Sequence, residues 1–208
     1  WGNNTVDLIY QQSYAPVREQ SDAAGHSVRA VYLYTAMADY ASRSDDEKMI
    51  AACKRLWNSI VRKRMYITGG IGSTGIGEAF TVDYDLPNDT AYAESCASVG
   101  LMMFASRMLE LEPKGEYADG MENAFYNTIL AGMSLDGKRF FYVNPLDVNR
   151  GVSGVASTHW HDKPERSGWY ACACCPPNVA RAISSFGKYA YGESETACFC
   201  HLFAAGEV

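Results

Sequence analysis

The stretch ESCASVGLMMFASRMLELEPKGEYADGMENAFYNTILAG, residues 94–132, decides the fold. Its first part, residues 94–111, repeats apolar side chains three and four positions apart, which predicts an amphipathic helix. The same spacing predicts a second helix over residues 116–132. Pro113 and Gly115 interrupt the pattern and leave only a short connection. The stretch therefore predicts two antiparallel helices that form a hairpin.

The same periodicity predicts three more helices outside this hairpin. They cover residues 27 to about 41, residues up to 60 after a cap at Ser44 or Asp45, and residues 176–191. The remaining expected elements are a turn at 135–138, a strand at 140–143 and a terminal strand at 196–203. Long loops link the helices, so we expect a mainly α fold that ends in β structure.

Composition excludes several classes of protein. The chain has 208 residues, 48% of them apolar, and its 18 Lys+Arg against 24 Asp+Glu leave a net charge of −6. An acidic chain of this kind does not bind chiefly to nucleic acid or to anionic membranes. Its longest apolar run, residues 99–105, is far below the roughly 18 residues of a membrane span. Because the chain starts at Trp1 and ends in a strand, we expect an internal piece of a longer polypeptide.

A glycine string at residues 70–75, GIGSTG, matches the spacing of a dinucleotide-binding loop. That function requires a strand before the string and a helix after it. Here a predicted helix precedes it, and an acidic, aromatic segment follows it. We therefore expect a flexible loop whose backbone approaches a ligand or another segment.

Cysteines form the most unusual pattern in the chain. Their number, seven, excludes a fully paired disulfide framework. Three of them lie in the string CACCPPN, residues 172–178, where a helix begins and its dipole favours a thiolate. The alternative is that these small side chains simply fill a core. We expect Cys53 to be a core residue, and Cys198 and Cys200 to be packed and not metal ligands.

A second group could act with these thiols. Glu94 and Cys96 open the helix at residues 94–111 and lie two positions apart. Together with Cys174 and Cys175 they offer one oxygen and three sulfurs, a set that zinc accepts. Their spacing is not that of common zinc motifs, so the pattern alone leaves the site open.

Other ionisable residues are ambiguous. Glu78, at the end of the glycine-rich loop, suits a general acid/base if the fold desolvates it, but sequence alone favours a solvated loop charge. His26 is either a ligand contact or simply a residue at a helix start. His159 and His161 flank Trp160, and we expect exposed loop histidines there, with a second metal site as the alternative.

Six strings in order carry a family resemblance. They are GHSVR (25–29), TGGIG (68–72), GEAF (77–80), YDLPN (84–88), ESCAS (94–98) and CACCPPN (172–178). Together they resemble the zinc-dependent cysteine glycosidases of glycoside hydrolase family 127, the β-L-arabinofuranosidases. The resemblance extends from about residue 26 to residue 191.

The resemblance implies a fold, an activity and a partner. The fold is an (α/α)6 barrel catalytic domain, with residues 1–193 as its later half and residues 194–208 as the start of a β-sandwich. The activity is retaining hydrolysis of terminal β-L-arabinofuranosyl groups on an arabinose-containing oligosaccharide or glycan. A homodimer is compatible with a half barrel, which would expose core faces.

It also implies roles for individual residues. The zinc ligands by position are Glu94, Cys96, Cys174 and Cys175. Cys174 matches the nucleophile and Glu78 the general acid/base. Residues that match sugar contacts are His26, Glu122 and Tyr142, the last two on shorter strings. One departure is Ser95, where the family often has Thr.

Two other functions compete with the glycosidase. One is a structural-zinc or carbohydrate-binding fragment without chemistry, for which Glu78 is dispensable. The other is a thiol redox protein, which requires a disulfide among Cys172, Cys174 and Cys175. Zinc thiolates favour a reducing cytoplasm, while a periplasmic location stays open.

Overall fold

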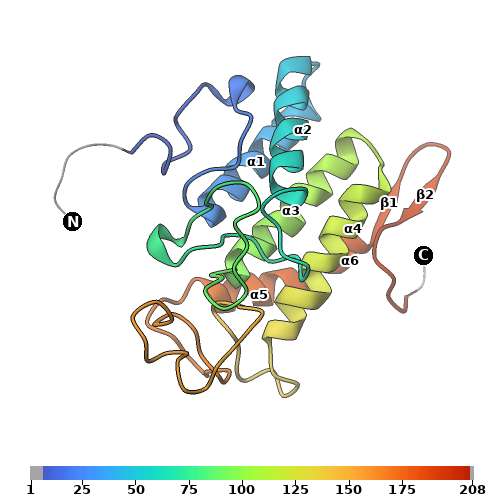
Figure 1. Cartoon of the computed structure of the whole chain (residues 1–208). Helices are drawn as coiled ribbons and strands as arrows, with labels where there is room; N and C mark the ends of the chain where they lie inside the picture. Colours follow the sequence, from blue (N-terminus) through green and yellow to red (C-terminus); the bar gives the residue numbers. More distant parts are fainter. Residues whose placement is uncertain (1–6, 207–208) are drawn as a thin grey trace.

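The computed structural model describes residues 7–206 and is mainly helical (Figure 1). In chain order its elements are η1 (Val17–Glu19), α1 (Ser27–Ala41), α2 (Glu47–Val61), η2 (Ile76–Glu78), α3 (Ser95–Leu111), α4 (Gly115–Ala124), the π-helical η3 (Phe125–Leu130), α5 (Cys175–Ser184), α6 (Gly187–Ala190), β1 (Tyr191–Glu193) and β2 (Cys198–Cys200). The mainly α fold is as predicted.

Helix α3 is the centre of the packing. It contacts α1, α4, η3 and α5, and most of its residues are buried. Small residues let the neighbouring backbones come close: a Cβ added at Gly100 would lie 2.4 Å from Cγ2 of Val31 on α1. Large side chains such as Phe104 fill the remaining space against Trp57 of α2, with ring centroids 5.7 Å apart. A helix that is buried on several sides organises the others around it.

The close approach at Gly100 predicts a large loss of stability for Gly100→Ala. The added methyl group meets a stiff β-branched side chain in a filled core, so we expect the free energy of unfolding to fall by about 1–3 kcal/mol. The matched control is Gly115→Ala, because nothing lies within 4 Å of a Cβ at the first position of α4. Thermal unfolding of both variants measures the difference. Equal midpoints would contradict this packing.

The helices begin where the sequence patterns predict, except that the N-cap of α2 is a different residue. Helix α1 has the predicted bounds, and α3 begins one residue after its N-cap, Glu94. The cap of α2 is neither Ser44 nor Asp45 but Asp46, whose carboxylate accepts a 3.0 Å hydrogen bond from the backbone N–H of Met49. The preference follows from geometry, because an N-cap oxygen must reach the N–H groups of the first turn.

The second helix of the hairpin changes its winding. Residues 115–124 are α-helical, whereas residues 125–130 widen into a π-helix. The glycine-rich loop packs where this change occurs: a Cβ at Gly69 (φ 78°) would lie 2.5 Å from the backbone nitrogen of Ala124. Thr128 also donates a 2.6 Å hydrogen bond to the carbonyl of Thr68. The string at residues 70–75 also comes close to another segment, as predicted, because a Cβ at Gly72 (φ 90°) would lie 2.8 Å from Oγ of Ser27.

The C-terminal part of the chain differs from the prediction. The helix expected over 176–191 ends at Ser184, and Tyr191 already belongs to β1, which pairs antiparallel with β2. The expected strand at 140–143 is reduced to isolated bridges, such as those of Phe140 with Met133 and with Ser167. The backbone there bonds in turn to several different segments, for example Phe140 to Ser167 and Phe141 to Gly132, so no continuous ladder forms.

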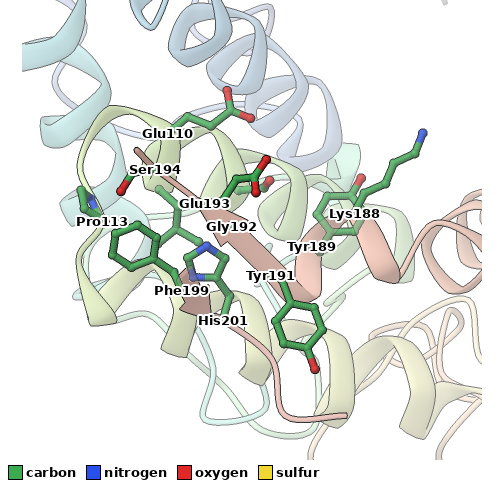
Figure 2. Close-up of a pocket in the computed structure, with 12 residues that line it drawn as sticks. Glu110, Pro113, Lys188, Tyr189, Tyr191, Gly192, Glu193, Ser194, Phe199 and His201 are labelled. Carbon is green, nitrogen blue, oxygen red and sulfur yellow. The ribbon is translucent and has the colours of Figure 1, made fainter. Parts of the chain in front are cut away.

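Cys198 and Cys200 are exposed, so the expectation that they are packed was wrong. Residues 198 and 200 alternate with the partly buried Phe199 along β2, so both cysteines lie on the solvent-facing side of the two-stranded hairpin. The other side borders a hollow of about 480 Å³ between the hairpin and the end of α3 (Figure 2). Figure 2 shows Phe199 and His201 with parallel rings there, their centroids 6.1 Å apart. None of the predicted site residues lines this hollow.

Long loops gather beside the starts of α3 and α5 (Figure 1). The loop at residues 62–94 and the loop at residues 145–174 are joined there by contacts such as that between His159 and Asp89. This end of the helices carries the candidate site. Within residues 7–206, no helix is both long enough and apolar enough to cross a membrane.

Candidate active site

Four predicted metal ligands lie together where two helices begin. Glu94 and Cys96 come from the start of α3, and Cys174 and Cys175 from the start of α5. One ligand atom from each lies within 4.8 Å of all the others. The Sγ atoms of Cys174 and Cys175 are 3.4 and 3.5 Å from Oε1 of Glu94, and those of Cys96 and Cys175 are 3.2 Å apart.

Charge in this cluster is poorly balanced by the protein alone. Glu94 is 1% exposed, and burial followed by the nearby Cys174 charge raises the pKa of its carboxyl to about 8. Hydrogen bonds from Cys175 and Cys96 lower the pKa of the Cys174 thiol. The pKa of Cys175 is raised, because its hydrogen bonds with Cys174 and Cys96 favour its protonated form. Oε2 of Glu94 has no hydrogen-bond partner among the described residues. Three sulfurs and a carboxylate of this kind fit a divalent cation that prefers thiolates, such as zinc.

Glu78 lies next to this cluster and is held by two donors. His26 Nε2 is 2.9 Å from its Oε2, and the hydroxyl of Tyr92 donates to its Oε1 at 2.6 Å. The His26 hydrogen bond contributes most to lowering the pKa of this half-buried carboxyl, and burial opposes it. Glu78 adopts φ 54°, a left-handed conformation that is uncommon outside glycine and is often found at functional sites. It is therefore not the solvated loop charge that sequence alone favoured.

His26 has two partners, and this settles what it does in the fold. It is the N-cap of α1, where its Nδ1 accepts a 3.4 Å hydrogen bond from the backbone N–H of Arg29. Its other nitrogen faces Glu78. One ring thus joins the start of a helix to the candidate acid/base.

A cleft of about 520 Å³ opens onto these groups. Glu78, Tyr92 and Tyr142 line it together with Cys172. The hydroxyl of Tyr142 is 2.9 Å from Sγ of Cys174, and burial followed by that contact raises the pKa of the phenol. The phenol therefore keeps its proton and can donate it in a hydrogen bond to a Cys174 thiolate. Tyr142 thus connects the cleft that Glu78 lines to the Cys174 sulfur.

Glu122 lies apart from the other predicted sugar contacts. It is on α4, it does not line the cleft, and its side chain makes no hydrogen bond to the site within the described residues. The histidines of the loop also differ from expectation. The side chains of His159 and His161 are mostly buried, and they pair with Asp89 at 3.3 Å and Asp162 at 3.0 Å. They are not exposed loop histidines, because these carboxylates hold them inside the loop.

Two residues of the site escaped the sequence analysis. Tyr92, which holds Glu78, lies two positions before Glu94 in a segment without periodicity. Asn178 donates a 3.0 Å hydrogen bond from Nδ2 to Sγ of Cys96. Its signal was present, because Cys175 and Asn178 are three positions apart and so share one face of α5.

Fold and site together define a mainly helical domain that holds a cysteine-rich centre beside a hydrogen-bonded carboxylate. A family model described as the GH127 catalytic domain of β-L-arabinofuranosidases matches residues 3–188. The chain therefore belongs to the GH127 β-L-arabinofuranosidase family.

Characterised relatives agree. The chain is 50% identical over 186 residues to a non-reducing end β-L-arabinofuranosidase of Bifidobacterium longum subsp. longum, a match over 89% of this chain and 28% of that protein. A GH127 β-L-arabinofuranosidase structure from Geobacillus stearothermophilus T6 is 54% identical with a TM-score of 0.90, over 93% of this chain and 30% of the other. The GH127 β-arabinofuranosidase BT3674 is 42% identical with a TM-score of 0.85, over 94% and 29%. The chain thus spans less than a third of each relative.

Proposed function

We propose that this chain carries the catalytic centre of a retaining glycosidase that releases terminal β-L-arabinofuranosyl groups from arabinose-containing oligosaccharides or glycans. The observation that carries the proposal is the cleft lined by Glu78 and Tyr142, in which the Tyr142 hydroxyl lies 2.9 Å from Sγ of Cys174 directly behind the lining. Family membership supports the β-L-arabinofuranosyl group. The chain would form the later half of an (α/α)6 barrel, with a β-sandwich beginning near residue 194.

The centre would be a zinc site with Glu94, Cys96, Cys174 and Cys175 as ligands. Bound zinc would keep Cys174 as a thiolate at neutral pH and leave it strongly nucleophilic. The hydrogen bond from Asn178 to Cys96 would orient that ligand and help to hold the metal.

In the first step, Cys174 Sγ attacks the anomeric carbon and forms a carbon–sulfur bond. The bond from that carbon to the leaving oxygen breaks, and Glu78 transfers its proton to this oxygen. The donors His26 and Tyr92 favour the ionised carboxyl in the open cleft. A sugar that fills the cleft removes water from Glu78, which raises its pKa toward the protonated form that this step needs.

In the second step, Glu78 acts as a base. It takes a proton from a water molecule whose oxygen attacks the anomeric carbon, and the carbon–sulfur bond breaks to return Cys174 as the thiolate. His26 and Tyr92 stabilise the carboxylate at the start of this step. Two inversions give net retention of configuration.

Proton NMR of the full-length protein acting on methyl β-L-arabinofuranoside tests the proposal. We expect the first arabinose released to carry the β configuration and to mutarotate afterwards. Release of the α anomer would contradict a nucleophilic Cys174. A folded, zinc-loaded protein that releases no arabinose would favour the alternative of a structural-zinc or carbohydrate-binding domain.

A further inference from the structure

Trp160 and Trp169 stand in water at the rim of the active cleft. Their exposed fractions are 57% and 64%, although tryptophan is usually highly buried. Both line the same cleft as Glu78. Exposed aromatic rings beside a polar site are typical of surfaces that bind a ligand, because the ring loses little entropy when it is covered.

The loop that carries Trp160 is anchored on both sides of this residue. His159 pairs with Asp89 at 3.3 Å, and His161 Nε2 lies 3.3 Å from the backbone carbonyl oxygen of Thr90. The Trp160 ring packs edge-on against the His161 ring, with centroids 5.4 Å apart. An exposed ring on so firmly held a loop is presented to solvent by the fold and does not result from a loose segment.

A second hollow adjoins the active cleft at this point. It measures about 380 Å³ and shares Trp160 and His161 with the cleft, so these two residues form the ridge between them. Residues 73–76 form one wall, and Ser157 and Thr158 lie in another. Hydroxyl groups thus share the lining with the apolar side chains of Ile76, Pro87 and Trp160, a mixture that suits a sugar, which has both hydroxyl groups and apolar ring faces.

The ridge also has unused hydrogen-bonding capacity. Nδ1 of His161 is buried and has no hydrogen-bond partner among the described residues. It faces Gly75 in the wall of the second hollow, where an added Cβ would lie 2.9 Å from it. A buried acceptor without a partner costs free energy unless a ligand or water satisfies it.

The position of Glu78 decides which part of a substrate would lie there. Residues 73–76 form a wall of the second hollow and lead along the chain, through Gly77, into Glu78, which lines the active cleft. The group that leaves takes its proton from Glu78, so it departs on the Glu78 side. We propose that Trp160 and the second hollow bind the sugar units on the leaving-group side of an arabinofuranosyl oligosaccharide. This inference rests on the proposed function.

We call Trp160 and the second hollow together the groove. Calorimetry with two ligands measures binding to this groove separately from the reaction. The full-length Glu78→Gln protein, in which turnover is strongly slowed, is titrated with a β-L-arabinofuranosyl trisaccharide and with methyl β-L-arabinofuranoside. We expect Trp160→Ala in this background to weaken trisaccharide binding about tenfold, because stacking on the ring is lost. Binding of the methyl glycoside should change less than about twofold. The matched control is Val155→Ala, an exposed apolar residue of the same loop that lines neither hollow.

The outcomes separate the groove from the reaction. Equal weakening for both ligands, or none for either, overturns the groove and leaves the proposed function standing. A second outcome is that the trisaccharide binds more tightly than the methyl glycoside and Trp160→Ala removes this difference, while the protein with Glu78 intact releases no arabinose. That result supports the groove and overturns the proposed function. Binding of neither ligand overturns both.

Discussion

Glu78→Gln should lower turnover of a methyl β-L-arabinofuranoside by about 10²–10⁴-fold, the range for loss of a general acid/base. Glutamine keeps the size of the side chain and can still meet the hydroxyl of Tyr92, but it cannot transfer a proton. The metal should stay at one zinc per chain by native mass spectrometry, because Glu78 is not among the four clustered ligands. This separation of chemistry from metal binding distinguishes an enzyme from a structural-zinc domain.

The leaving group provides a further check on Glu78. A nitrophenyl leaving group departs without protonation, so the first step should lose less for that substrate than for the methyl glycoside. Glu165→Gln is the matched control, because this exposed glutamate lies outside the site. Unchanged turnover in Glu78→Gln, or an equal loss on both substrates in the first step, would remove Glu78 from the role of general acid.

Cys174→Ser should abolish turnover, with a loss of about 10⁴-fold or more as expected for removal of a nucleophile. Serine is a weaker metal ligand than a thiolate, so the variant should also lose zinc at lower chelator concentrations than the parent protein. Turnover and zinc affinity should fall together because they depend on the same atom. Cys174 Sγ lies beside the proposed zinc ligand Glu94 and also 2.9 Å from the hydroxyl of Tyr142, which lines the cleft.

Intact mass spectrometry makes the nucleophile visible. In the Glu78→Gln background with the nitrophenyl substrate, the first step proceeds without an acid while the second is slowed, so an arabinosyl group should accumulate on the protein and map to Cys174. Cys198→Ser, a change at an exposed thiol far along the chain, should leave the adduct and the zinc unchanged. An adduct that persists in Cys174→Ser would assign the reaction to another residue.

The sequence predicted the helices that have continuous apolar spacing and strong end signals. α1 and α3 are examples, because their cores need only the residues of the helix itself. It failed where tertiary contacts decide. The π-helix forms against the loop at Gly69, and the expected helix over 176–191 gives way to a hairpin whose strands hold only three residues each.

The candidate site shows the same division. The strings at Glu94 and Cys174 identified the cluster through family resemblance, while spacing alone left it open. Tyr92 and Asp162 carried no signal in the sequence. Tyr92 acts through its hydrogen bond to Glu78, 14 residues away, and Asp162 is notable only because the fold buries it completely. Glu122 stays a prediction, since its side chain makes no bond to the site within the described residues.

The cap of α1 has a chemical consequence. Nδ1 of His26 accepts a hydrogen bond from the backbone N–H of Arg29, so the single proton of the neutral ring resides on Nε2. From there the ring donates a hydrogen bond to Glu78. Fraying of the first turn of α1 would release Nδ1 and let the other tautomer form. Glu78 would then lose the bond that contributes most to its lowered pKa. The proton affinity of this carboxyl is thus linked to the local folding of a helix that itself supplies no nucleophile.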